Sequence, residues 1–174
     1  ESSSQSPFYS VKIHFHKYQA TGNDFVLIDN RTGLYSFTIE QIQKICDRRF
    51  GVGADGLILI EGHPALDFNL NYYNSDGSQS LCGNGSRAGV MMAASLGLLN
   101  DKTKFNAYDG THEAELFPSG IVRLKMNPVT EVKKVGLDYF INTGSPHHLR
   151  FVTDLKSYPV FEDGREIRYN KEYA

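Results

Sequence analysis

Apolar and polar residues alternate, or form short apolar blocks, in several places along the first half of the chain. The alternation in VKIHF (11–15) is typical of a half-buried strand. The following residues, YQATGNDF, read as a turn because glycine, asparagine and aspartate favour turns. By the same reasoning, further strands are expected at VLID (26–29), LILIE (57–61) and FNLNYY (68–73).

A helical spacing of apolar residues begins after Thr38. Thr38 with Gln41 three positions later forms a capping-box signature, which predicts a helix running to about Arg49. Cys46 falls on the apolar face of this helix, so we interpret it as a small core hydrophobe. The glycines of GVGADG (51–56) follow a helix and precede a strand, the reverse of a dinucleotide-binding fingerprint, so they are interpreted as a helix end and a turn.

Residues 86–98 are apolar or small on nearly every side, which predicts a buried helix. After it, KFNAY, HEAELF and IVRLKMN read as three short strands separated by turns. The expected fold class is therefore α+β, a lobe of mostly antiparallel strands wrapped around a central buried helix. We place this lobe at 11–127, after a flexible leader at 1–10. Residues 128–174, entered through NPVTEVKK, are expected to be the incomplete start of a second lobe.

Composition and charge narrow the classes of partner. Hydrophobic residues make up 40% and charged residues 22% of the chain, as in soluble globular proteins. A net charge of −2 without a basic run predicts no nucleic-acid partner, and the absence of a cationic amphipathic helix predicts no membrane partner. The leader ESSSQSPFYS does not resemble a signal peptide, and two cysteines form no disulfide framework. We therefore expect reduced thiols and a cytoplasmic protein.

The stretch LCGNGS (81–86) places Cys82 directly before the buried helix. Unpaired backbone N–H groups at a helix start favour a thiolate and also attract an anionic group such as a carboxylate. The glycines on both sides of Asn84 let a ligand approach the main chain closely. Cys82 therefore fits a nucleophile or a proton-transfer acid/base, and it fits equally a buried cysteine that only caps the helix.

Three polar turns complete the candidate chemistry. YYNSDGSQS (72–80) and ATGNDF (20–25) supply amide and hydroxyl groups, and together with Cys82 they favour a polar small-molecule pocket. GSPHHL (144–149) brings two histidines, but neither HxxxH nor CxxC spacing occurs, so no metal site is predicted.

Four segments resemble the N-terminal half of the diaminopimelate epimerase family: KYQATGNDFVLID, RRFGVGADGLILI, FNLNYYNSDGSQSLCGNGSRAG and GSPHHL. The resemblance extends from about Val11 to about Val152. It implies a cofactor-free epimerase, with no metal, that interconverts LL- and meso-2,6-diaminopimelate on the way to lysine and peptidoglycan. It also implies two similar lobes with the site between them, and a homodimer.

The same resemblance assigns roles to individual residues. Cys82 matches the family's first catalytic cysteine, which gives or takes the α-proton on one face of the substrate. Gly83 and Asn84 match the residues that hold the α-carboxylate. The other substrate-binding matches are Asn23, Asn74 and His147.

The sequence departs from the family pattern at three points. Gly56 stands where the family often has a glutamine, and Ser145 stands where it has an asparagine, so contacts to the distal end of the substrate are in doubt. The family's second lobe, with its second catalytic cysteine, is not found within these residues. Because two-base inversion needs groups on both faces of the substrate, we expect the chain alone to be inactive.

Two other hypotheses remain open at this stage. One keeps the fold and changes the substrate, giving a proline or hydroxyproline racemase or an isomerase of phenazine biosynthesis. The other is a non-catalytic ligand-binding or partner module in which Cys82 only caps its helix.

Overall fold

The computed structural model describes residues 12–171 and 173. They form two compact units. The first ends at Pro128 and also includes Thr143–Ser145, and the second comprises Val129–Asn142 and the chain from Pro146 onward. The leader expected at 1–10 lies outside the described residues.

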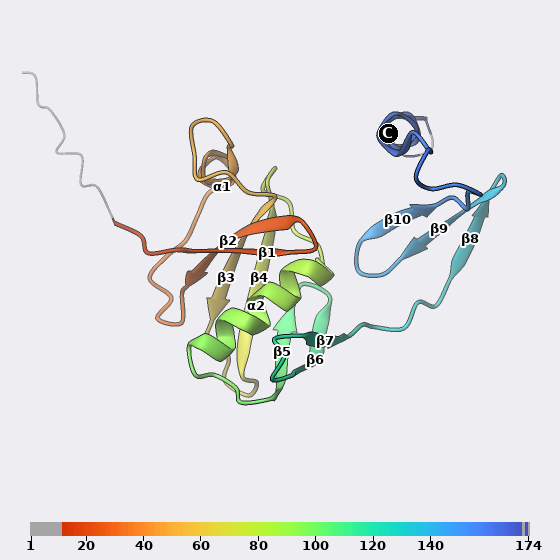
Figure 1. Ribbon diagram of the computed structural model, residues 1–174. Coiled ribbons are helices and arrows are strands. Elements are labelled where there is room, and N and C mark those ends of the chain that lie inside the picture. Colours follow the sequence, from red (N-terminus) through yellow and green to blue (C-terminus); the bar gives the residue numbers. More distant parts are fainter. Residues whose placement is uncertain (1–11, 172, 174) are drawn as a thin grey trace, which may run out of the picture. The chain divides into compact units, whose positions relative to one another are not determined.

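The first unit is built on a seven-stranded sheet in which the strands lie in chain order (Figure 1). Two neighbouring pairs, β2 with β3 and β4 with β5, are parallel, and the other four are antiparallel. The expectation of mostly antiparallel strands is therefore confirmed. The strands are β1 (His16–Ala20), β2 (Asn23–Asp29), β3 (Gly56–Glu61), β4 (Phe68–Asn74), β5 (Lys102–Ala107), β6 (Gly110–Leu116) and β7 (Val122–Lys125).

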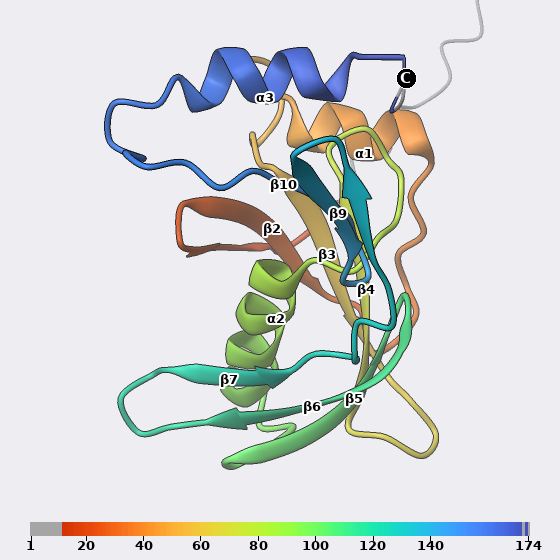
Figure 2. The same ribbon diagram turned by 90° about the vertical axis from the view of Figure 1, so that its right-hand side faces the viewer.

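Helix α2 (Gly83–Ser95) lies in the hollow of this sheet (Figures 1 and 2). It contacts both edge strands, β1 and β7, and four strands between them, which requires the sheet to curl around it. Val90, Met92 and Ala93 are fully buried, so the prediction of a buried central helix is confirmed. The helix starts at Gly83, three residues before the predicted start, because the Gly-Asn-Gly segment is already helical.

Helix α1 (Ile39–Cys46) covers the opposite face of the sheet, where Ile42 and Cys46 pack on β2 and β3. The predicted capping box is present: Gln41 N donates to Thr38 Oγ1, and Thr38 N donates to Gln41 Oε1. The helix ends at Cys46 and not near Arg49. The reason is local, since the side chain of Asp47 accepts hydrogen bonds from the backbone N–H groups of Arg49 and Phe50 and so turns the chain.

The strand predicted at 11–15 is wrong over the residues that are described. Lys12–Phe15 carry no strand, and β1 instead covers His16–Ala20, most of which had been assigned to a turn. β1 pairs with β2 from His16 opposite Leu27 to Ala20 opposite Asn23, which leaves only Thr21 and Gly22 as the connection. Both have positive φ, 53° and 90°, as a tight primed hairpin turn requires.

The second unit holds a three-stranded antiparallel sheet in the order β10, β9, β8, and a helix. Its elements are β8 (Val132–Val135), β9 (Asp138–Asn142), β10 (Pro146–Leu149) and α3 (Val160–Arg168). Arg150 forms ion pairs with Asp138 and Asp163, which ties the sheet to α3. In the part of the chain that the structure describes, no helix has the length and apolar character needed to cross a bilayer.

Candidate active site at the start of helix α2

Cys82 is the N-cap residue of α2, with extended backbone angles (φ −116°, ψ 108°). Its Sγ accepts a hydrogen bond from the N–H of Gly85 at 3.3 Å, and its carbonyl accepts from Ser86 N at 2.7 Å. Cys82 as a residue is partly exposed. The N–H groups of the first turn have no partner within the helix, so they create a partial positive charge beside this thiol.

The glycines around Asn84 keep the helix start open. Gly83 is the first residue of α2. A Cβ at Gly85 would lie 3.3 Å from the Cβ of Cys82, which is tighter than ordinary contact, and 3.5 Å from its sulfur. Glycine therefore lets Cys82 sit close over the first turn of the helix.

A chain of hydrogen bonds fixes the side chain of Asn84. Its Nδ2 donates to Asn23 Oδ1 at 2.9 Å, and Asn23 Nδ2 donates to Asp55 Oδ2 at 2.8 Å. The other oxygen of Asp55 accepts from Arg48 Nη2 at 2.8 Å. The turn before β2, the loop before β3 and the start of α2 thus meet at one place.

Asp24 reinforces this cluster from the neighbouring position. It is paired with Lys17 and Arg48, both at 2.7 Å, and its backbone carbonyl accepts from Asp55 N. The hydrogen bond from Arg48 holds the pKa of Asp24 well below its usual range; burial opposes this shift, and Lys17 adds to it. Asp24 is therefore ionised throughout the neutral range.

Asn74 lies at the end of β4, where the NSDGS turn begins. Its Nδ2 donates to the carbonyl and hydroxyl oxygens of Ser78 and to the hydroxyl of Ser80. Its Oδ1 accepts from the hydroxyl of Tyr72 at 2.9 Å. Tyr72 and Cys82 belong to the same packed cluster, so Tyr72 links the Asn74 turn to the start of α2.

The turn at Thr143–Ser145 also belongs to the first unit. Leu81 N donates to Gly144 O at 3.2 Å, and a Cβ at Gly144 would lie only 2.7 Å from the Cβ of Leu81. Gly144 also has a φ of +96°, which only glycine adopts without strain. This distant segment therefore packs on the residue that immediately precedes Cys82.

The predicted site residues fall into two groups. Asn23, Asn74, Cys82, Gly83 and Asn84 all lie in the first unit, in the arrangement described above. His147 lies in the second unit, on β10, where it pairs in register with Ile141 of β9.

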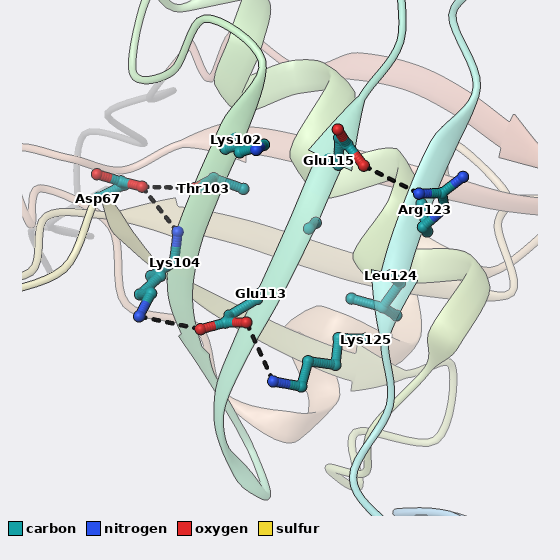
Figure 3. Close-up of a pocket in the computed structure, with 10 residues that line it drawn as sticks. Asp67, Lys102, Thr103, Lys104, Glu113, Glu115, Arg123, Leu124 and Lys125 are labelled. Carbon is teal, nitrogen blue, oxygen red and sulfur yellow. Dashed lines mark hydrogen bonds and ion pairs between the residues drawn. The ribbon is translucent and has the colours of Figure 1, made fainter.

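A separate hollow of about 670 Å³ lies over β5, β6 and β7, and no residue from the start of α2 lines it (Figure 3). Its side chains pair with one another across the strands. Glu113 contacts Lys104 and Lys125, and Glu115 contacts Arg123. Because these charges largely neutralise each other, we interpret the hollow as a solvated sheet face.

The start of α2 combines a thiol, a set of backbone N–H groups and a fixed amide side chain. Such a site can bind a carboxylate at the helix start and exchange a proton with an atom attached to it. Among residues 12–171 and 173, no group of three His, Cys, Asp or Glu side chains is placed to hold a metal ion.

Comparison with known proteins identifies the family. The family model described as diaminopimelate epimerase matches residues 15–132. The chain belongs to the diaminopimelate epimerase family. A diaminopimelate epimerase of Flavobacterium psychrophilum is 48% identical over 164 residues, covering 93% of this chain and 64% of that protein. One from Chlorobaculum tepidum is 42% identical over 160 residues, covering 87% of this chain and 62% of that protein.

The chain thus spans somewhat under two thirds of the length of these diaminopimelate epimerases. A crystal structure of a phenazine biosynthesis protein of the PhzF family from Bacillus anthracis matches with a TM-score of 0.55 at 16% identity. The match covers 78% of this chain and 53% of that protein. At this identity the likeness concerns the fold alone, and it agrees with the expected lobe of strands around a central helix.

Sequence reasoning missed three residues that organise the site. Asp55 accepts hydrogen bonds from both Asn23 and Arg48, yet the GVGADG segment that contains Asp55 was interpreted only as a helix end and a turn. Tyr72 was taken only as a strand residue at the edge of a polar turn. No local pattern reveals these contacts, because Asp55 and Asn23 lie 32 positions apart.

Proposed function

We propose that the protein acts in the interconversion of LL- and meso-2,6-diaminopimelate, with Cys82 as the proton-transfer group on one face of the substrate. Membership of the family supports the reaction. The observation that carries the assignment of Cys82 is its position as the N-cap of α2, beside the Asn84 side chain held by Asn23.

In this proposal the α-carboxylate of the substrate binds at the N–H groups of Gly83 and Asn84. The partial positive charge of the helix start favours the carboxylate, and it also favours the negative charge that develops when the α-proton leaves. Cys82, as a thiolate, takes that proton, and as a thiol it returns one. Asn23 and Asn74 supply further amide contacts to the substrate, and His147 is proposed as another substrate contact. The expected mechanism needs no cofactor.

Inversion of the stereocentre needs a second proton-transfer group on the opposite face. Cys46 does not fit this role, since only 4% of it is exposed and it packs between α1 and the sheet, on the face opposite α2. Burial raises the pKa of Cys46 to about 11, because the thiolate is poorly solvated there. We therefore propose that residues 1–174 alone do not complete the reaction.

The two free thiols fit a reducing compartment such as the cytoplasm. A homodimer is proposed from the family resemblance. Neither point affects the assignment of Cys82.

Ligand protection of Cys82 tests the proposed substrate. The 174-residue chain is treated with iodoacetamide with and without millimolar meso-diaminopimelate, and modification of the Cys82 peptide is followed by mass spectrometry. We expect meso-diaminopimelate to slow modification of Cys82, and L-proline at the same concentration to have little effect. Equal protection by proline, or no protection by either compound, would contradict the assignment of the substrate.

A variant separates binding at the helix start from general shielding. Asn23→Ala removes the acceptor of Asn84 and is expected to reduce the protection by diaminopimelate. Asn106→Ala removes a similar bond between two asparagines, Asn106 Nδ2 to Asn69 Oδ1, on the opposite face of the sheet. It should leave the protection unchanged.

A further inference from the structure

The backbone of Asp55 is held from two sides. Its carbonyl oxygen accepts a hydrogen bond from Ser75 N at 3.1 Å, and its own N–H donates to the carbonyl of Asp24 at 2.9 Å. These bonds place Asp55 between the NSDGS turn and the start of β2, independently of its side chain. The carboxylate is thereby brought to the side-chain amide of Asn23.

The carboxylate of Asp55 acts only as an acceptor. Oδ1 accepts from Arg48 Nη2 at 2.8 Å, and Oδ2 accepts from Asn23 Nδ2 at 2.8 Å and from the N–H of Asp24 at 3.2 Å. The guanidinium of Arg48 and the backbone N–H of Asp24 can only donate, so both oxygens are needed as acceptors. The atom of Asn23 that faces Asp55 must therefore be the amide nitrogen, because a carboxylate offers no proton to an amide oxygen.

This orientation is passed on to Asn84 in the first turn of α2. Because its nitrogen is bound to Asp55, Asn23 turns Oδ1 toward Asn84, whose Nδ2 donates to it at 2.9 Å. Asn84 Oδ1 has no hydrogen-bond partner among residues 12–171 and 173. It is not fully buried, since Ser86 Oγ is the only buried side-chain nitrogen or oxygen in that part of the chain without a partner. One carboxylate thus sets the direction of two amides in series.

The two amides therefore offer oxygens, and not N–H groups, to a further partner. Besides Oδ1 of Asn84, Oδ1 of Asn23 has a second lone pair that the bond from Asn84 does not use. The neighbouring main chain has the opposite character, since the first N–H groups of α2 are donors without a partner in the helix. Acceptors beside donors match an amino acid, whose α-ammonium donates and whose α-carboxylate accepts.

We propose that Asp55 is a positioning residue that sets the amides of Asn23 and Asn84 to accept from the α-ammonium of an amino-acid substrate. The carboxylate of the same substrate lies at the N–H groups of α2. An amide turned the other way would point its own N–H groups at the ammonium and repel it. The inference rests on the proposed function for the identity of the ligand, whereas the direction of the amides can be tested without any ligand.

Asp55→Asn tests this role with little change of shape. The new amide has a single oxygen, so it cannot accept from both Arg48 and Asn23 as the two carboxylate oxygens do. Protection of Cys82 from iodoacetamide is titrated with meso-diaminopimelate and with pimelate, which has the same carbon chain and carboxylates but no ammonium group. Asp55→Asn should weaken protection by diaminopimelate roughly tenfold or more, because a hydrogen bond to a charged group is lost. It should weaken protection by pimelate much less.

Asp67→Asn is the matched control. Oδ2 of Asp67 also accepts from one side chain and one backbone N–H, the hydroxyl of Thr103 and the N–H of Lys104, but it does so where β4 meets β5. This variant should leave protection by both ligands unchanged. If Asp55→Asn weakens protection by both ligands equally, or by neither, the inference is overturned, because a residue that only supports the fold does not distinguish them.

A measurement on the unmodified protein does not depend on the folding of Asp55→Asn. With ¹⁵N and ¹³C labelling, NMR couplings across hydrogen bonds should run from Asn23 Nδ2 to the carboxyl carbon of Asp55 and from Asn84 Nδ2 to the side-chain carbonyl carbon of Asn23. A coupling from Asn23 Nδ2 to the side-chain carbonyl carbon of Asn84 would overturn the inference. If the expected couplings are found but diaminopimelate fails to protect Cys82 in the unmodified protein, the assigned substrate is wrong and the amide directions stand.

Discussion

The side-chain amide of Asn84 donates a hydrogen bond to Oδ1 of Asn23 across 2.9 Å, although the two residues lie 61 positions apart in the chain. Asn23 begins β2 and Asn84 lies in the first turn of α2. This bond therefore joins the start of β2 to the helix start that carries Cys82. It accounts for the presence of an asparagine between two glycines, where the helix start is otherwise bare of side chains.

Asn23→Ala should loosen the helix start. The change leaves Asn84 Nδ2 without this acceptor and Asp55 without one donor, and it is expected to lower the free energy of unfolding by about 1–2 kcal/mol. Urea unfolding measures the loss. Asn106→Ala, the control used for ligand protection, removes an amide pair on the outer face of the sheet and should have a smaller effect. Equal losses in the two variants would contradict a special role for the Asn23 bond.

Arg48→Gln should make the free energy of unfolding depend less on pH in the acid range. Arg48 is the largest cause of the lowered pKa of Asp24, so it favours the ionised form in the folded state. A carboxyl with a lowered pKa stabilises the fold above its unfolded pKa of about 4, and this contribution is lost as the pH falls further. The urea midpoints of the two proteins should therefore differ most near neutral pH and converge in acid.

Arg123→Gln is the matched control for this prediction. Arg123 pairs with Glu115 on an exposed part of β7, where a single ion pair contributes little. The urea midpoint of Arg123→Gln should follow that of the unmodified protein at every pH. A difference for Arg48→Gln that persists unchanged in acid would argue against linkage through Asp24.

Gly89→Ala tests how closely α2 packs on the sheet. The new Cβ would lie 2.3 Å from Cδ1 of Leu70, a residue that is only 2% exposed. Overpacking of this kind should lower the free energy of unfolding by about 1–3 kcal/mol. Gly164→Ala in α3 is the control, since no atom lies within 4 Å of its added Cβ and alanine favours a helix. An unchanged stability for Gly89→Ala would contradict the close packing.

Isotope exchange tests the proposal that residues 1–174 do not complete the reaction. The purified chain is incubated with meso-diaminopimelate in D₂O, and the α-carbons are examined by NMR. One proton-transfer group could exchange the α-proton without inversion, but the carbanion needs a dry, closed site, which we propose residues 1–174 alone do not complete. We therefore expect no deuterium incorporation. Incorporation that disappears in Cys82→Ala and persists in Cys46→Ala would contradict this expectation.

Much of the first unit could be predicted from local sequence. The capping box at Thr38 and the burial of Cys46 both follow from residues within one or two turns of a helix, and both are confirmed. The apolar character of the central helix likewise predicts its burial between strands. These features depend on short-range patterns, which the sequence displays directly.

The first strand and the supports of the candidate site could not be predicted in this way. The alternation at 11–15 is as regular as that of a strand, but β1 is defined by the hairpin register with β2, which begins at His16. The links from Asn23 to Asp55 and from Leu81 to Gly144 join segments that only the folded sheet brings together. Side-chain partners of this kind leave no periodic signal in the sequence.

The rate at which iodoacetamide modifies Cys82 near neutral pH tests most directly whether this residue is a poised proton-transfer thiol. The 174-residue chain contains its own reference, since Cys46 is buried and should react only after unfolding. We predict that Cys82 reacts faster than the cysteine of an unstructured peptide at pH 7, because its sulfur lies at the positive end of α2 and accepts from the N–H of Gly85. Modification of Cys82 no faster than the peptide would contradict the account and favour a cysteine that only caps its helix.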